Sequence, residues 1–342
     1  MKKIWQTIVF LFFAGTALWA LPTEEKCLEW LEKHVPAKVS KEYLEENVRW
    51  ALAGTRDRAW ARDLPDAIFL EYVLPYISVG ETADPWREGF VKMLLPRVAD
   101  CETATQVAER LNNELWDLVD VHYSPLRDKP DQSPFHSMRI RKASCTGLSI
   151  LLIDACRAVG VPARLVSCVW PHKPGNHSWV EIYDGGNWLY LGAGDGGKVN
   201  DAWFNADTAM CENVPPAHHI YALTWGERSL KIPLYWRENY CVPADDVTAR
   251  YLTLNKSKLP LCVSVIDRSG RRVATEIRVY DAAGTPLAGT LTTFDDRHDL
   301  NDHLKIEGVP ATAKIRVEAA DGRKLVPVPS RHRGLLLFSI EE

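Results

Sequence analysis

Long apolar runs, blocks of like charge and compact metal-binding motifs are all scarce in this sequence, and each scarcity excludes a class of protein. The only strongly apolar run in the 342 residues lies at residues 8–14, well short of the roughly 20 residues that a membrane-spanning helix requires. Lys and Arg number 41, Asp and Glu number 45, the net charge is −4, and no basic block or tail stands out. That distribution argues against a nucleic-acid partner or an anionic membrane surface. No CxxC or HExxH spacing occurs, so we expect neither a metal nor a cofactor.

The first 20 residues have the organisation of a secretory signal peptide. Lys2 and Lys3 precede the apolar run, and small residues follow it at Gly15, Ala17 and Ala20. A charged start, a short apolar segment and small residues at the end are typical of such leaders. We therefore expect cleavage after Ala17 or Ala20 and a soluble protein, secreted or periplasmic, with no membrane span.

Eight cysteines are scattered over the chain, at wide spacings that do not resemble a small disulfide scaffold. If Cys145 is a free reactive thiol, seven cysteines are left and at least one more is unpaired. Cys156 and Cys168 stand in apolar stretches, where we expect buried thiols and not bridge partners. The pairing of the other cysteines stays open.

Three regions follow the signal peptide. Residues 21–126 carry apolar residues at helical spacing in CLEWLEKHV, YLEENVRWALAG and ATQVAERLNNELWDLVDVHY, which predicts a helical lobe. Residues 127–243 form a central core. Residues 247–342 consist of short alternating segments separated by turns, such as TARYLTL, LCVSVID and AKIRVEAA, and predict a β-sandwich of prealbumin-like or immunoglobulin-like type without catalysis. We expect the tryptophans of the helical lobe to be core residues, namely Trp50, Trp60, Trp86 and Trp116.

Cys145 opens the most apolar stretch of the central region. It lies in SCTG, just before LSILLIDACRAVG, which contains no proline, is apolar almost all round and ends at Gly160. This pattern predicts a buried helix that starts at or near Cys145 and is capped by the glycine. The partial positive charge at a helix start favours a thiolate, the reactive form of cysteine. A small buried apolar cysteine is the alternative interpretation, and the residues downstream weigh against it.

Two strand patterns follow this helix. ARLVSCVW alternates as a β-strand, and HSWVEIYD starts a second strand at His177. DGGN is a tight hairpin signal, and WLYLG is the returning strand. The predicted fold is therefore α+β, with a helix packed on an antiparallel sheet. A histidine at a strand start is often a satisfied hydrogen-bonding residue, but facing a helix start it could serve as the base for Cys145.

Taken together, these residues resemble the transglutaminase-like fold of the papain-like cysteine superfamily. The resemblance rests on the cysteine at a helix start, RAVGVPARLV, HSWVEIY, a glycine turn and WLYL, and it covers about residues 130–205. It implies that Cys145 is a nucleophile, that His177 is its base and that a later acid orients the imidazole.

The acid is the least regular member of this set. The family pattern places an aspartate four residues after the tryptophan of the returning strand, Trp188, and this sequence has Gly192 there. Asp195 is the best substitute. It resembles a variant of the family in which an acid follows a Leu-Gly-Ala turn and a Trp-Phe pair comes soon after, here Trp203 and Phe204.

Three further polar residues are considered for the site. Asp201 is the reserve acid, whereas Asp184, at the far end of the hairpin, should be too distant. Gln132 lies in the irregular segment SPLRDKPDQSPFHSMRIRKA that leads to the nucleophile. Its amide could donate to an oxyanion, although a surface glutamine in a loop is the commoner explanation.

The resemblance implies a secreted thiol enzyme that hydrolyses amide or peptide bonds through a Cys-His-Asp triad and a thioester acyl-enzyme. A catalytically inactive scaffold or binding protein is one alternative, and the displaced acid is its main support. A protein cross-linking acyltransferase is another, because a triad does not distinguish water from an amine as second nucleophile. The expected partner is a protein or peptide substrate. Host protein, dietary peptide and cell-wall stem peptide are all compatible with it.

Overall fold

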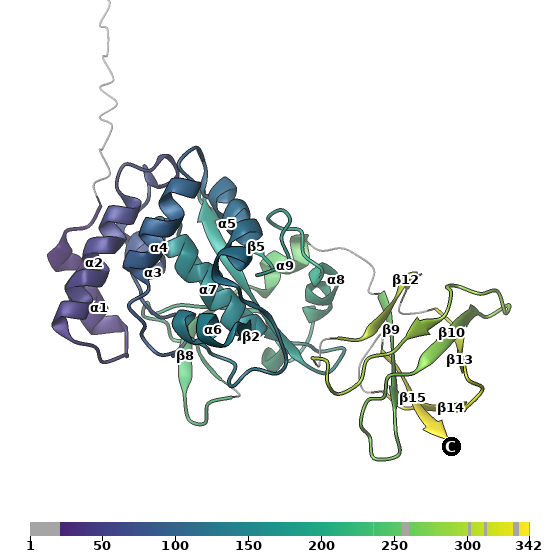
Figure 1. Ribbon diagram of the computed structural model, residues 1–342. Coiled ribbons are helices and arrows are strands. Elements are labelled where there is room, and N and C mark those ends of the chain that lie inside the picture. The colour runs from purple at the N-terminus through teal and green to yellow at the C-terminus, as the bar shows by residue number, and fades with distance from the viewer. Residues whose placement is uncertain are drawn as a thin grey trace, which may run out of the picture.

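The computed structural model describes residues 21–234, 236–254, 260–299, 302–310, 313–330 and 335–341. The expected signal peptide at residues 1–20 lies outside the described residues. Within the described ranges, no helix is both long enough and apolar enough to cross a membrane. Figure 1 shows a larger body of helices and strands, with the C-terminal strands set to one side of it.

Five helices form the N-terminal part of this body, and capping residues mark where several of them begin. Thr23, Ser40 and Thr103 each accept a backbone N–H at a helix start, and Thr103 forms a capping box with Gln106. The helices are α1 (Glu24–His34), α2 (Lys41–Thr55), α3 (Asp66–Tyr72), α4 (Arg87–Leu94) and α5 (Ala104–Val119), with 3-10 turns at Ala59–Ala61 and Leu95–Arg97. This part of the chain is helical, as its apolar spacing predicts.

Helix α7 (Cys145–Ala158) lies at the centre of the core (Figure 1). Every residue from Thr146 to Ala158 is buried, because α2, α4 and α5 pack against the helix, as do two neighbouring strands. A helix that is apolar all round requires such cover. Gly160, with a φ of +80°, lies just past its end. A short helix α6 (Pro134–Ile140) and a parallel pair of β1 (His122–Tyr123) and β2 (Lys142–Ala143) precede it.

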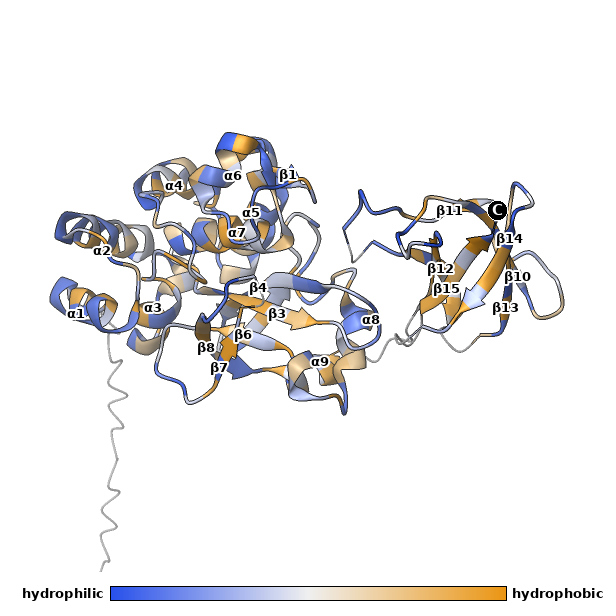
Figure 2. Cartoon of the chain, turned by 90° about the horizontal axis from the view of Figure 1, so that it is seen from below, coloured by the Kyte–Doolittle hydropathy of each residue, from blue (hydrophilic) through white to orange (hydrophobic). Residues whose placement is uncertain are grey.

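The strands that support α7 belong to a six-stranded antiparallel sheet with the order β5-β4-β3-β6-β8-β7. In the β3–β4 pairing, Cys168 lies opposite His177 and Arg164 lies opposite Glu181. Figure 2 shows hydrophobic and hydrophilic residues together along β3, β4 and β6. The strands are β3 (Ala163–Val169), β4 (Asn176–Asp184), β5 (Asn187–Leu191), β6 (Tyr221–Leu223), β7 (Lys231–Pro233) and β8 (Cys241–Asp246). The predicted helix on an antiparallel sheet is confirmed.

One hydrophobic core joins the helices to the sheet. Its buried residues run from Cys27 in α1 to Ala244 in β8. A second, aromatic cluster contains Trp170, Trp179 and Phe204, while the neighbouring Val180 belongs to the first. Successive side chains of β4 point to opposite faces of the sheet, so they pack in two different clusters. The division between residues 126 and 127 remains a prediction, and the core runs across it.

The segment TARYLTL, predicted as a strand, is the helix α9 (Thr248–Leu254), so that prediction is wrong. Asp246 caps it, because its carboxylate accepts the Thr248 N–H at 3.0 Å and the Thr248 hydroxyl at 2.7 Å. Tyr251 then accepts a hydrogen bond from Trp179 Nε1 at 2.6 Å and donates to Glu181 at 2.8 Å. These tertiary contacts outweigh the β-branched, aromatic composition that favours a strand.

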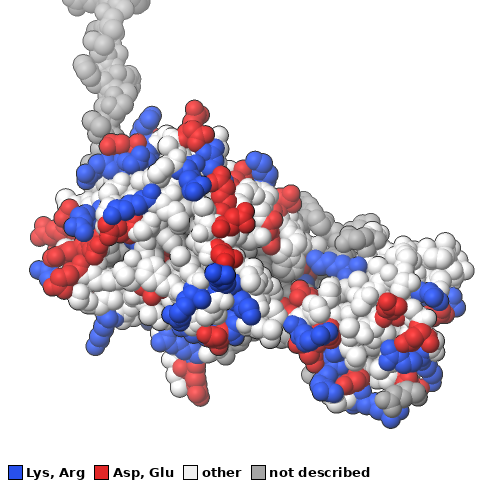
Figure 3. Space-filling view, in the orientation of Figure 1, with Lys and Arg blue, Asp and Glu red and all other residues white. Residues whose placement is uncertain are grey.

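The C-terminal module, residues 260–341, contains two sheets with the strand orders β11-β10-β13 and β12-β9-β15-β14. Their buried residues form a cluster of their own, which includes Val263, Ile277 and Phe338. Figure 3 shows both signs of charge mixed over the face in view. The prealbumin-like or immunoglobulin-like type remains a prediction. The strands are β9 (Pro260–Ile266), β10 (Glu276–Asp281), β11 (Leu291–Thr292), β12 (Leu304–Pro310), β13 (Ile315–Ala319), β14 (Lys324–Val328) and β15 (Leu335–Glu341).

Candidate active site

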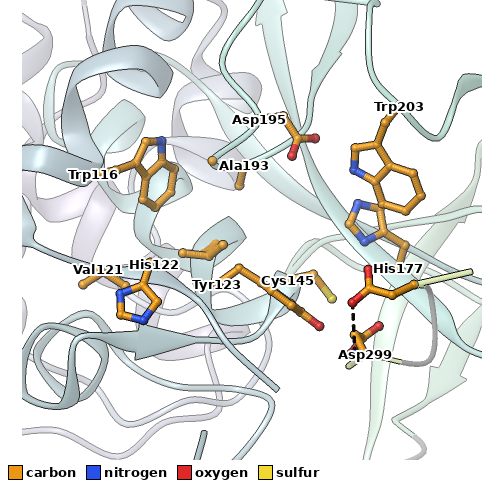
Figure 4. Close-up of a pocket in the computed structure, with 13 residues that line it drawn as sticks. Trp116, Val121, His122, Tyr123, Cys145, His177, Ala193, Asp195, Trp203 and Asp299 are labelled. Atoms are coloured by element: carbon orange, nitrogen blue, oxygen red, sulfur yellow. Dashed lines mark hydrogen bonds between the residues drawn. The ribbon is translucent and has the colours of Figure 1, made fainter. Parts of the chain in front are cut away.

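A cavity of about 380 Å³ is lined by residues of α5, α7, β4 and the C-terminal module. Cys145, His177 and Asp195 all line it (Figure 4). These three residues come from a helix start, a strand start and the turn after β5. The structure thus brings together the residues predicted as nucleophile, base and acid.

Cys145 is the first residue of α7, and the backbone around it is fixed on both sides. Ser144 caps the helix by accepting the Gly147 N–H at 3.0 Å, and its own hydroxyl donates to the Pro130 carbonyl at 2.6 Å. Backbone N–H groups of Thr146 and Ser178 are close enough to the sulfur to work against the rise in its pKa that burial causes. The same N–H groups are therefore available near the point where an oxyanion would form on a carbonyl attacked by Cys145.

The environment of this thiol holds it in the neutral form. Burial raises the pKa of Cys145, the Ser178 and Thr146 N–H groups oppose that shift, and the negative charge of Asp299 adds to it. The helix start expected to favour a thiolate therefore does not prevail here, because loss of hydration of the anion is the larger effect.

His177 is buried in an aromatic cage, and only 8% of it is exposed. Its ring centre lies 4.7 Å from that of Trp203, 4.9 Å from that of Phe204 and 5.9 Å from that of Trp179. Burial lowers the pKa of His177 to about 3, and the ammonium of Lys173 contributes to that shift. The imidazole is therefore neutral near pH 7, so a ring nitrogen has a lone pair for a proton, although in this buried state it is a weak base.

Asp195 takes the place of the side chain that Gly192 lacks. A side chain at position 192 would begin only 1.8 Å from Asp195 Oδ2. The turn folds back on itself here, since the Asp195 N–H donates to the Gly192 carbonyl at 3.2 Å. The carboxylate of Asp195 thus stands beside the position where the family pattern has its aspartate.

The link from this acid to the base runs past a tryptophan. Burial raises the pKa of Asp195 to about 6, and the side chain of Trp203 opposes that shift. The buried Nε2 of His177 has no hydrogen-bond partner within the described part of the chain. Figure 4 shows Trp203 beside both Asp195 and His177. In this state the base lacks its orienting bond from the acid.

Asn112 of α5 positions the turn that carries the acid, and the sequence does not reveal it. This fully buried amide donates to the Gly192 carbonyl at 2.9 Å and accepts the Gly194 N–H at 3.0 Å. Nearby, Glu109 accepts the Val199 N–H at 3.0 Å. An asparagine in an amphipathic helix gives no sequence signal that distinguishes this role from a surface one.

Several residues considered from the sequence lie elsewhere. Gln132 does not line the cavity, because its amide is turned to donate to the Lys142 carbonyl at 2.7 Å. Asp201 is exposed and also outside the lining. Asp184 accepts hydrogen bonds from Thr105 at the far end of the hairpin, as expected. Trp116, expected as a core residue, packs on the core and also lines the cavity.

A second histidine and acid lie close to the cavity but are bonded to each other. Asp207 Oδ1 is 2.8 Å from His172 Nε2 and 2.8 Å from Lys173 Nζ, and all three side chains are almost fully buried. Burial would raise the pKa of Asp207, but these two partners lower it to about 2. The carboxylate is thus committed to His172 and Lys173, and it reaches His177 only through its electric field.

The arrangement is suited to acyl transfer through a thiol. The neutral imidazole of His177 and the thiol of Cys145 share the cavity, and backbone N–H groups surround the sulfur. Proton transfer from thiol to imidazole would generate the nucleophile at the moment of attack.

Comparisons with known proteins agree with this chemistry at the level of family. Residues 92–193 match the family model described as the transglutaminase-like superfamily, which confirms the resemblance for that region. A comparison with curated proteins finds no match. Among solved structures, the chain is similar to a candidate cysteine protease from Cytophaga hutchinsonii, with 17% identity and a TM-score of 0.31 over 54% of this chain and 64% of that one. It is also similar to red sea bream transglutaminase, with 10% identity and a TM-score of 0.36 over 83% of this chain and 65% of that one. The chain thus spans just under two thirds of each of these two proteins.

Proposed function

We propose that this chain, whose residues 92–193 form a transglutaminase-like domain, is a secreted thiol enzyme that hydrolyses amide or peptide bonds. The observation that carries the proposal is the shared cavity of Cys145, at the start of α7, and the neutral base His177. Secretion rests on the leader-like residues 1–20 alone.

The reaction has two balanced halves. The sulfur of Cys145 bonds to the carbonyl carbon as its proton passes to His177. The carbon–nitrogen bond then breaks, and the amine leaves with that proton, so that a thioester remains. A water molecule gives a proton to His177 and attacks the thioester, the carboxylic acid leaves, and the proton returns to sulfur. Asp195 would hold the imidazole in the required tautomer once its carboxylate hydrogen-bonds the ring.

A catalytically inactive scaffold is the second candidate, and two observations favour it. Burial raises the pKa of the Cys145 thiol. The base also lacks a hydrogen bond from the acid in the described residues. Neither excludes catalysis, because His177 can take the thiol proton during the attack and catalytic hydrogen bonds often tighten only in the complex.

Alkylation by iodoacetamide across pH separates the two. Cys241 is exposed and serves as an internal reference in the same protein. For an enzyme, we expect Cys145 to react faster than Cys241 near neutral pH, and His177→Ala to remove the advantage, on the order of 10²-fold for a base-assisted step. His122→Ala is the matched control, because His122 also lines the cavity but is exposed. If Cys145 reacts no faster than Cys241, with or without His177, the protein is the catalytically inactive scaffold.

Hydrolysis and cross-linking are then distinguished by their products. The protein is incubated with a glutamine-bearing casein and a fluorescent primary amine. Hydrolysis predicts released ammonia or new peptide ends without dye on the casein. Dye incorporation that depends on Cys145 would assign the protein to the acyltransferases instead.

A further inference from the structure

The composition of the cavity walls is not explained by the catalytic steps. Besides Cys145 and His177, the wall contains three aspartates and three large aromatic side chains, and none of its described lining residues is Lys or Arg. Two of the aspartates, Asp299 and Asp302, belong to the C-terminal module, which was not expected to take part in the site. The aromatic residues are Trp116, Tyr123 and Trp203.

Asp299 and Asp302 are held in place by Arg272. Its Nη1 donates to the backbone carbonyls of both aspartates at 3.0 Å, and its Nη2 donates to the His298 carbonyl at 2.7 Å. Its Nε lies 3.3 Å from Asp296 Oδ1. The guanidinium therefore binds mainly backbone oxygens and sets the position of the two aspartates. The Asp299 N–H also donates to Asp302 Oδ2 at 3.1 Å (Figure 4).

Two contacts link the C-terminal module to the catalytic body. Burial raises the pKa of Tyr123, and Asp299 lies close enough to its side chain to add to that shift. Lys305 Nζ lies 4.9 Å from the centre of the Trp203 ring. The field of Asp299 reaches the reacting groups, since it raises the pKa of Cys145 and works to raise that of His177. Both effects are those of a negative charge that stabilises positive charge inside the cavity.

Carboxylates combined with aromatic faces are the chemistry that binds an ammonium group, through Coulomb attraction and cation–π contact. An anionic group in the same place would be repelled by the aspartates. The Trp203 ring already has the ammonium groups of Lys305 and Lys173 at 4.9 and 5.5 Å from its centre. We propose that Asp299 and Asp302, with the ring of Tyr123 in the same wall, form a subsite for a primary ammonium group of the peptide substrate, which makes the C-terminal module a determinant of specificity. This inference rests on the proposed thiol chemistry at Cys145 and adds the charge class of the substrate.

The test uses two thiol reagents that differ in charge and are close in size, aminoethyl methanethiosulfonate and sulfonatoethyl methanethiosulfonate. Rates at Cys145 are measured in the full chain carrying Cys241→Ser, and the cation-to-anion rate ratio is divided by that of free cysteine. We expect a quotient of about ten or more, which falls as salt is added. Because both reagents attack the same thiolate, the ratio does not depend on the thiol pKa.

Asp299→Asn with Asp302→Asn should bring the quotient close to one. Asparagine keeps a side-chain oxygen beside Tyr123 and an acceptor for the Asp299 N–H, so the loop should retain its shape. Asp321→Asn, an exposed turn residue of the same module, should leave the quotient unchanged. A quotient near one in the Cys241→Ser protein overturns the inference while the proposed function stands. A Cys145 that reacts with neither reagent contradicts the proposed function itself, and this inference with it.

A different observation concerns a buried pair of thiols. The sulfurs of Cys168 and Cys211 lie 3.5 Å apart, and both residues are buried. Cys168 is the second-last residue of β3 and lies directly opposite His177, and Cys211 ends the 3-10 turn Ala209–Cys211. We infer that these two cysteines form a disulfide in the exported protein, although Cys168 was expected to be a lone buried thiol. Each thiol loses a hydrogen, and a disulfide-carrying oxidant such as oxidised glutathione is reduced to two thiols.

Peptide mapping tests this directly. The full chain is refolded in a mixture of reduced and oxidised glutathione, denatured and alkylated without reductant. We expect a cross-linked peptide that contains Cys168 and Cys211. Cys168→Ser should make Cys211 alkylatable, whereas Cys156→Ser, a change at another buried cysteine, should leave the cross-link intact. Full alkylation of both Cys168 and Cys211 in the refolded protein would overturn the assignment.

Discussion

At the scale of single residues, the candidate triad acid is Asp195, whose carboxylate lies beside position 192, where the family pattern has its aspartate. Gly192 leaves a space, and Asp195 Oδ2 lies where the missing side chain would begin. The choice of Asp195 comes from the resemblance to a family variant in which an acid follows a Leu-Gly-Ala turn. The sequence does not predict that Trp203 lies beside the carboxylate and works to lower its pKa against the effect of burial, since that contact depends on how the segment after the turn packs.

Exchanging the two positions tests the role of the acid. Asp195→Gly should slow the chemistry at Cys145 by about 10²–10⁴-fold, because the imidazole loses its orienting group. Adding Gly192→Asp to that variant should restore part of the rate, since the carboxylate returns to the same space. Gly192→Asp alone should be defective, because its side chain collides with Asp195. The rates are measured by alkylation or, once a substrate is known, by hydrolysis. An Asp195→Gly variant that keeps the native rate would exclude Asp195 as the triad acid.

The raised pKa of Asp195 also predicts a pH dependence. Burial sets that pKa at about 6, so the carboxyl is neutral below this pH and charged above it. The rate at Cys145 should therefore rise as pH increases through about 6, a step separate from ionisation of the thiol at higher pH. The step should vanish in Asp195→Asn and persist in Asp201→Asn, whose target is exposed and outside the cavity.

At the scale of elements, the site depends on helices and turns that bring distant residues together. The sequence predicts α7, β3, β4 and β5 because each has a clear apolar period and a capping or turn residue. It does not predict which face of α5 holds the turn after β5. Asn112 joins these two elements, which lie 80 residues apart, and local pattern carries no information on such a contact.

Asn112→Ala should therefore weaken both the fold and the site. It removes one of the two donors to the Gly192 carbonyl and takes away the acceptor of the Gly194 N–H, at an expected cost of about 1–3 kcal/mol in the free energy of unfolding. Denaturation by urea measures that loss, and alkylation of Cys145 reports on the site. Asn113→Ala is the matched control, since Asn113 is exposed and bonds its own helix at the Glu109 carbonyl. Equal stability of the Asn112→Ala and Asn113→Ala variants would show that the hydrogen bonds of Asn112 do not stabilise the turn after β5.

The buried cluster of His172, Lys173 and Asp207 supports the loop after β3 in the same way. Asp207→Asn should destabilise the protein by about 3–5 kcal/mol, because it leaves the Lys173 ammonium buried without a counter-charge. The pKa of Asp207 is lowered from 3.8 to about 2, so its contribution to stability is complete above pH 3.8 and is lost as pH falls through about 2. Urea unfolding between pH 2 and 5 should show this loss in the native chain and not in Asp207→Asn.

At the scale of the whole molecule, a catalytic body and a C-terminal module share one cavity. The sequence predicts the class of the body, since the residues that carry the resemblance are close together in the chain. It predicts no role in the site for Asp299 and Asp302, because they lie about 150 residues from Cys145 in a segment whose pattern indicates only strands and turns.

That sharing predicts a change in the nucleophile when the module is altered. Asp299 raises the pKa of Cys145, so Asp299→Asn should lower it and shift the pH profile of iodoacetamide alkylation toward lower pH. The neutral reagent separates this effect from the preference for charged reagents. Asp321→Asn should leave the profile in place, and a profile unmoved by Asp299→Asn would show that the module does not act on the thiol.

The positions of Asp299 and Asp302 in the chain also separate the segment that encodes catalysis from the segment that encodes part of the substrate-selecting wall. The nucleophile, the base and the acid are encoded within 51 residues, from Cys145 to Asp195, whereas part of the wall that selects the substrate is encoded more than a hundred residues later. Changes in the C-terminal module can therefore alter substrate specificity in related proteins while the nucleophile, the base and the acid stay the same. Replacing the loop between β11 and β12 with an acidic, neutral or basic loop would then change which substrates are selected and leave the catalytic residues unchanged.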